Sequence, residues 1–155
     1  MALPSGLLAR LEGQLDSLDR AVDGIASEAL ARRTASGKWS AHENVAHLAR
    51  HAHVFLGRVR AILAEDRPTL PRYRAEDDPE WPAWAALTTP EAIRRLGEAR
   101  RELIALVRGL DDEALRRTAV HPALGEMTLA LWLEFLLLHE GHHLYTVLKR
   151  ARGVE

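Results

Sequence analysis

Hydrophobic residues recur every three to four positions in four stretches of the chain, which is the spacing of one face of an α-helix. The first stretch covers about 7–22 and the second about 40–64. The third covers about 89–109 and the fourth about 128–153. No stretch shows the alternating pattern of a half-buried strand, so the sequence predicts an all-α fold built from four helices.

The second and third helices begin with recognisable capping signals. Ser40 and Glu43 fit a capping box, in which the hydroxyl caps the helix and the carboxylate reaches back to the backbone. Thr89 followed by Pro90 predicts an N-cap and a proline at the first helical position. Segment 66–89 holds four prolines and an acidic run, so we expect a long connection between these two helices.

Length and composition are those of an ordinary globular protein. With 155 residues, 47% hydrophobic and 28% charged, the chain is expected to form one domain over 1–155. A net charge of −1 argues against general nucleic-acid binding. The most apolar run, 129–138, is too short to cross a bilayer, and the chain does not begin with a signal-peptide pattern. We therefore expect a cytoplasmic protein that does not enter membranes.

The chain contains no cysteine. This excludes disulfides, zinc–thiolate sites and a cysteine nucleophile within the chain. Any thiol that takes part in its chemistry must therefore come from a substrate or cofactor.

Histidine is the residue type that suggests chemistry. Seven of the eight histidines fall in the second and fourth predicted helices: His42, His47, His51, His53, His139, His142 and His143. His139 and His143, four residues apart, share a helix face and continue an apolar stripe, so both rings should face the interior. Surface histidines are common and such a pair alone is a weak signal, but two buried imidazoles need partners, which a divalent metal ion supplies.

The depth of the histidines along the bundle indicates the order of the helices. His47 lies roughly 10 Å from the predicted start of the second helix at Ser40, at 1.5 Å per residue. His143 lies roughly 15 Å from the predicted end of the fourth helix, and about 22 Å from its start. The two levels agree better if these helices run antiparallel. The sequence thus predicts an up-down-down-up four-helix bundle with one long crossover between helices 2 and 3.

Several motifs together resemble the DinB-like (YfiT-like) superfamily. They are the segment Gly37-Lys38-Trp39-Ser40, the following helix with His47-Leu48, and the late run His139-Glu140-Gly141-His142-His143-Leu144. The resemblance extends over nearly the whole chain, including the proline-rich connection and the entry to the last helix at 125–129.

This resemblance implies an up-down-down-up bundle, often a homodimer, that binds zinc, nickel or another divalent ion. The family's first metal histidine matches His47, and its paired ligands match His139 and His143. His51 and His142 are not required by the family pattern. Characterised relatives include S-transferases and isomerases that use low-molecular-weight thiols of the bacillithiol or mycothiol type.

Three functional hypotheses follow. The first is a metal-dependent transferase that activates a small thiol for attack on an electrophile, since the metal would favour the thiolate. The second is a hydrolase that uses metal-activated water. The third is a metal-binding stress protein without turnover.

Supporting residues have a functional and a plain structural interpretation. Glu140 and His51 are weak catalytic candidates, although a solvated glutamate and a hydrogen-bonded core histidine are the commoner roles. Asn44 could orient a ligand, but a solvated polar position is more common. Trp81 and Trp84 either cover the site or, more often in such loops, anchor the long connection.

Overall fold

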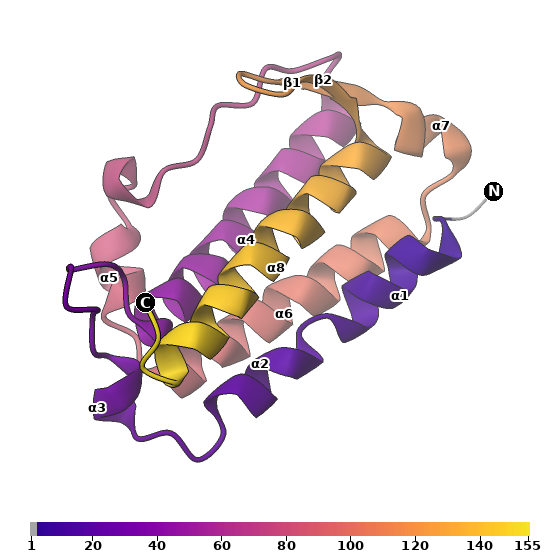
Figure 1. The fold of residues 1–155 in the computed structure, drawn as a ribbon. Helices are drawn as coiled ribbons and strands as arrows, with labels where there is room; N and C mark the ends of the chain where they lie inside the picture. The colour runs from indigo at the N-terminus through magenta and orange to yellow at the C-terminus, as the bar shows by residue number, and fades with distance from the viewer. Residues whose placement is uncertain (1–2) are drawn as a thin grey trace.

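Four helical legs form the protein in the computed structural model, which describes residues 3–155 (Figure 1). The first leg comprises two consecutive helices, and each of the other three is one long helix. The elements of the four legs are α1 (Ser5–Gly13) with α2 (Asp16–Val22), α4 (Ala41–Ala64), α6 (Thr89–Arg108) and α8 (Leu129–Ala151). No described helix is long and apolar enough to cross a membrane.

The legs follow the predicted up-down-down-up order. In Figure 1, α1, α2 and α8 run in one direction, whereas α4 and α6 run in the other. The crossover between α4 and α6 occupies one end and side of the bundle and carries only short helices, namely η1 (Ala75–Asp77) and α5 (Trp81–Ala85). The remaining short helices are α3 (Ser27–Leu30), between α2 and α4, and α7 (Asp112–Arg116), which follows α6.

The start of α4 is capped as the sequence predicts. The Glu43 backbone N–H donates to the Ser40 hydroxyl over 3.0 Å, and the Ser40 backbone N–H donates to the Glu43 carboxylate over 2.9 Å. These reciprocal bonds satisfy two of the free donors at a helix N-terminus. The capping box therefore fixes the residue at which α4 begins. The distance of each α4 histidine from that end of the helix follows from the constant rise per residue.

The predicted cap of the third leg is wrong by one residue. Thr88 caps α6 by accepting from the Glu91 backbone N–H, and Thr89 is the first helical residue. The Thr89 hydroxyl is instead hydrogen-bonded to the His42 ring Nδ1 at 2.8 Å. Two adjacent threonines offer equivalent caps in sequence, and only this contact with α4 distinguishes them.

The expectation that the chain has no strand is also wrong. β1 (Thr118–His121) and β2 (Gly125–Thr128) form a small antiparallel hairpin between α7 and α8. Gly125 adopts a positive φ of 76°, which glycine adopts without steric cost. An isolated parallel bridge from Thr69 to Val120 attaches the beginning of the crossover to this hairpin. Each strand has only four residues, two on each face, so its pattern is hard to recognise in the sequence.

The first predicted helix is interrupted at its middle. α1 ends at Gly13, a poor helix former, and α2 begins at Asp16. The Gln14 side chain donates to the Leu137 carbonyl at 3.0 Å and to the Glu140 carboxylate at 2.8 Å. The break thus lets a side chain of the first leg bind to α8.

Glu140 belongs to a buried polar network between the first leg, α6 and α8. Its side chain is almost fully buried, and the Arg100 guanidinium forms an ion pair with it at 2.5 Å. Arg100 also donates to the Leu11 carbonyl at 2.8 Å. Because both carboxylate oxygens are engaged, by Arg100 and Gln14, the buried charge is paired and hydrogen-bonded.

The apolar core consists of two clusters that occupy opposite ends of the bundle. One contains Phe55 to Ile62 of α4 with Leu129 to Leu137 of α8. The other contains Ala41 to Ala49 of α4 with Leu144 and Val147 of α8. The interior histidines of α4 and α8 lie at the level where these clusters meet.

The buried pair gives a prediction about stability. Changing Glu140 to Ala should lower the free energy of unfolding by about 3–5 kcal/mol, because it leaves the Arg100 cation buried and unpaired. Replacing both residues by Met should cost much less, since no charge remains without a partner. Urea unfolding followed by circular dichroism measures both, and equal losses in the single and double variants would contradict this account.

Candidate metal centre

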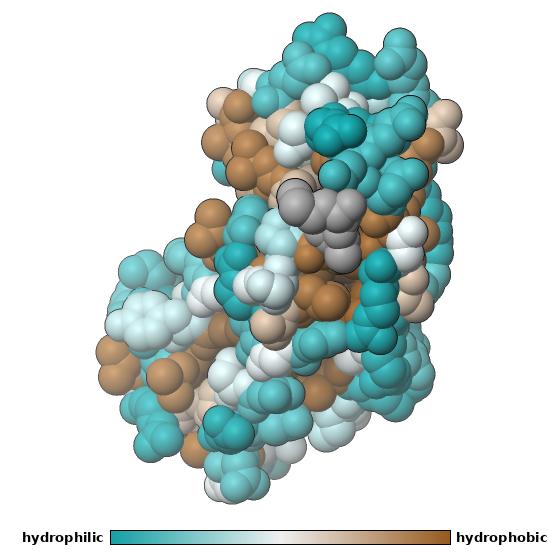
Figure 2. Space-filling model, turned by 90° about the vertical axis from the view of Figure 1, so that its right-hand side faces the viewer, coloured by the Kyte–Doolittle hydropathy of each residue, from teal (hydrophilic) through white to brown (hydrophobic). Residues whose placement is uncertain are grey.

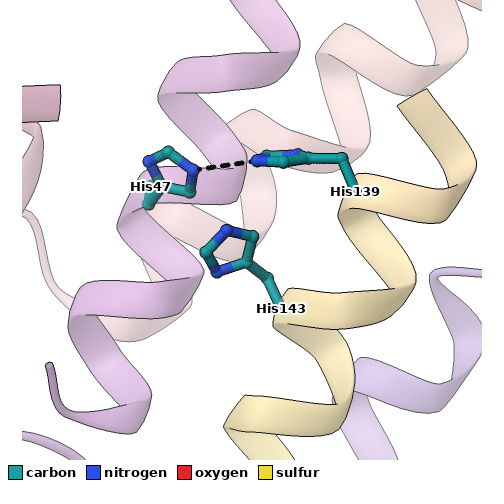
Figure 3. A group of neighbouring side chains, drawn as sticks. All are labelled: His47, His139 and His143. Carbon is teal, nitrogen blue, oxygen red and sulfur yellow. Dashed lines mark hydrogen bonds between the residues drawn. The ribbon is translucent and has the colours of Figure 1, made fainter. Parts of the chain in front are cut away.

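His47, His139 and His143 converge in the interior of the bundle. His47 comes from α4, and the other two come from successive turns of α8 (Figure 3). One ring nitrogen from each residue can be chosen so that all three atoms lie within 4.8 Å of one another. The structure thus brings together the three residues that the sequence analysis selected.

The separation of two of these nitrogens matches coordination of a common ion. His47 Nε2 and His139 Nε2 are 3.3 Å apart (Figure 3). Two imidazole nitrogens at 2.0–2.1 Å from a tetrahedral zinc ion would be about 3.3–3.4 Å apart. The Nε2 atoms of His47 on α4 and His139 on α8 thus have the separation expected of two nitrogens around such an ion.

Asn44 fixes the orientation of the third ring. Its Oδ1 atom is 2.8 Å from His143 Nδ1, and its amide nitrogen donates to the Ser40 carbonyl at 2.8 Å. That second bond directs the amide oxygen toward His143, so Nδ1 must be the protonated nitrogen of a neutral ring. His143 Nε2 then carries a free lone pair, and in Figure 3 it is turned toward the other two rings. Asn44 is buried, so its expected role as a solvated residue is wrong.

Burial keeps all three rings neutral. It lowers the pKa of His47 to about 3, that of His139 to about 4 and that of His143 to about 2, with the neighbouring histidines adding to the effect. Removal from water penalises the charged imidazolium. Neutral imidazole is the form that binds metal, so the site needs no rise in pH to become competent.

Two further ring nitrogens of this cluster are buried without a partner in the part of the chain that the structure describes. The Nδ1 atoms of His47 and His139 are buried and have no hydrogen-bond partner among the described residues. A divalent ion bound by the facing Nε2 atoms would fix both rings in the tautomer that carries the proton on Nδ1. The donor set of three neutral imidazoles therefore fits zinc, nickel or a similar divalent ion.

Aromatic side chains enclose the outer side of the triad. The His47 ring lies 5.4 Å from the Trp39 ring, 5.7 Å from Tyr73 and 6.3 Å from Trp81. Trp39 and Trp81 stack on each other at 5.0 Å. Trp81 thus covers the site, whereas Trp84 is buried in the core and anchors the crossover.

The remaining candidates lie outside the cluster of coordinating atoms. The ring of His51 is buried 4.1 Å from that of His139, but His51 is not part of the group that could hold an ion. Glu140 is neither solvated nor free to act as a base, since Arg100 and Gln14 occupy its carboxylate. His142 is exposed, as expected for a residue about 100° around the helix from His143.

Sequence reasoning missed the parts of the site contributed by the crossover. Tyr73 contacts the rings of His47 and His51, and its hydroxyl donates to Asp78 at 3.0 Å. Asp78 also accepts from the Arg50 guanidinium at 2.6 Å, so an ion pair to α4 holds this segment in place. Asp78 lies 28 residues after Arg50 in the sequence. No local pattern in the acidic run around Asp78 indicates that the two residues pair.

The chain belongs to the DinB superfamily, whose family model matches residues 10–147. This assignment agrees with the bundle topology and with the histidines on α4 and α8.

Two proteins of bacilli illustrate the similarity in sequence. A protein of Oceanobacillus iheyensis, named as a candidate metal-dependent hydrolase, is 26% identical over 139 residues, which cover 88% of this chain and 79% of that protein. The uncharacterised protein YuaE of Bacillus subtilis is 25% identical over 133 residues, covering 78% and 82% of the two chains.

A solved structure shows the same fold. It is that of YfiT from Bacillus subtilis, described as a probable metal-dependent hydrolase with an unusual four-helix bundle topology. The match has a TM-score of 0.77 and 25% identity, and it covers 97% of this chain and 87% of YfiT. The up-down-down-up bundle is thus shared with a relative of known structure.

The depressed pKa values predict how the metal-free protein responds to acid. Below about pH 6.5 the unfolded chain binds protons at these histidines and the folded chain does not, so the free energy of unfolding should fall as pH decreases toward about 4. A His143→Gln variant lacks one such group and should show a shallower pH dependence. Urea titrations between about pH 7.5 and 5 measure it, with the exposed His142→Gln as control. If the free energy of unfolding of His143→Gln depended on pH as steeply as that of the native protein, the lowered pKa of His143 would be contradicted.

Proposed function

We propose that this protein holds one divalent metal ion through His47, His139 and His143 and uses it to hydrolyse a small substrate. The observation that carries the proposal is the convergence of three neutral imidazoles, one buried and two partly buried, with a nitrogen of each within 4.8 Å of the others. The names given to the relatives from Oceanobacillus iheyensis and Bacillus subtilis support hydrolysis as the reaction class. Zinc and nickel are among the ions that an all-imidazole donor set suits, and they are the ions that we propose.

Three protein ligands leave at least one coordination position open, as catalytic metal sites do. When bound, the ion would lower the pKa of a water molecule or thiol at that position and polarise an electrophilic group of the substrate.

The chain's own residues would position and shield this centre. Asn44 accepts the Nδ1 proton of His143 and so keeps the ring's other nitrogen available. Trp39, Trp81 and Tyr73 cover the outer side of His47 and reduce the access of bulk water. A water-poor, aromatic environment strengthens electrostatic interactions with a bound ion.

Thiol transfer is the second candidate, and one observation favours it. Among the described residues, no acidic side chain joins the three histidines in the group that could hold an ion. Glu140, the nearest glutamate in sequence, is bound by Arg100. A thiol with a pKa near 8.5 loses its proton more readily than water and needs a general base less. With no cysteine in the chain, that thiol would be a separate small molecule.

Metal content tests the centre directly. Purified protein should contain about one zinc or nickel ion per chain by elemental analysis, and alanine at His47, His139 or His143 should abolish stoichiometric binding while circular dichroism stays helical. Asn44→Ala should weaken metal affinity about 10–100-fold, because it frees the His143 ring to rotate. His142→Ala is the matched control on α8. Full metal occupancy in the three ligand variants would refute the site.

Activity assays with the metal-loaded protein separate the candidate reactions. Hydrolysis of chromogenic esters or amides without added thiol, lost in His139→Ala, is the expected result. Conjugation of a chromogenic electrophile only in the presence of bacillithiol would instead assign thiol transfer. Tight metal binding with neither activity would favour the third hypothesis, a binding protein without turnover.

A further inference from the structure

Arg58 is a buried cation without a counter-ion. Only 7% of the residue is exposed, and among the described residues its one hydrogen bond runs from Nη2 to the Pro71 carbonyl at 2.7 Å. No ion pair among the described residues includes it, and burial lowers its pKa. Its guanidinium stacks over the Trp132 ring at 5.6 Å. A buried charge without a counter-ion is unfavourable, so such a group calls for an explanation.

A cavity of about 400 Å³ adjoins this guanidinium. It lies between α4 and the crossover, and its apolar wall comes from Val54, Leu70 and Pro71. Arg50 and Arg74, also at its edge, are already paired with Asp78 and Asp77. Arg58 and the exposed Arg72 have no acidic partner among the described residues, so the cavity keeps an excess of positive charge.

The candidate metal centre is linked by the Tyr73 side chain to this cavity, although none of the three histidines lines the cavity. Tyr73 lines it, and the Tyr73 ring also lies 5.7 Å from the His47 ring. On α4, Arg58 follows His47 by eleven residues, three helical turns, and so lies on the same face. On α8, Trp132 beneath Arg58 precedes His139 by seven residues, about 10 Å along the helix.

We propose that Arg58 binds the carboxylate of the substrate, which lies with an apolar stem in this cavity and its reacting group at the histidine triad. A guanidinium with free donors on one edge matches a planar carboxylate in two parallel hydrogen bonds. The apolar wall fits a short hydrocarbon stem rather than a polyanion. That the carboxylate belongs to a substrate rests on the proposed function, whereas the anion site itself does not.

Binding of hexanoate tests the anion site. The probe is added to protein freed of metal with EDTA, since a carboxylate could also bind a metal ion, and the Trp132 indole N–H signal is followed by NMR. Hexanoate should shift this signal in a saturable way and bind at least ten-fold more tightly than hexanol. Arg58→Met should weaken hexanoate binding at least ten-fold. Arg60→Met, which removes an exposed arginine of α4, should leave binding unchanged.

The outcomes separate this inference from the proposed function. No shift with hexanoate, or equal binding to Arg58→Met, would overturn the inference even if the histidines bind zinc. Inorganic phosphate that displaces hexanoate at lower concentrations would overturn the assignment to carboxylates. Failure to bind zinc, with hexanoate binding intact, would refute only the metal centre.

The melting temperature of Arg58→Met gives a second test. It should be no lower than that of the native protein. A fall in melting temperature with unchanged hexanoate binding would overturn the inference and make Arg58 a structural anchor of the crossover.

Discussion

The antiparallel packing of α4 against α8 is the constraint on which the rest of the structure depends. This direction places His47, in the second turn of α4, level with His139 in the middle of α8 and His143 one turn later. The long crossover exists because the third leg must begin at the same end of the bundle as the second. The 24 residues of the crossover, 65–88, therefore lie outside the bundle, and they contribute Tyr73 and Trp81 to the outer wall of the site.

Patterns that act within one helix were predictable from the sequence. The capping box at Ser40, the extent of α4 and α8, and the inward direction of His139 and His143 all follow from spacing along a single helix. The level of His47 could also be matched, because a helix has a constant rise per residue. This explains why the sequence alone predicts both the bundle order and the histidine triad.

What was missed depends on contacts between distant segments. Glu140 was expected in solvent, but it is buried because Gln14 and Arg100, on two other legs, supply its partners. Asn44 was likewise expected to be solvated, but it is buried and binds His143 of α8. Tyr73 reaches the site region only through the path of the crossover, and Arg58 of α4 meets the crossover at the Pro71 carbonyl. No local pattern encodes such pairings, since either partner looks like an ordinary surface residue by itself.

The N-cap residue of α4, Ser40, has a second role besides starting the helix. The Ser40 carbonyl holds the Asn44 amide, and the Asn44 oxygen in turn selects the tautomer of His143. A relay of two hydrogen bonds therefore links the loop before α4 to an imidazole on α8. Fraying of that first turn would release the His143 ring, so the mobility of a loop at the rim could set how long an ion resides in the interior.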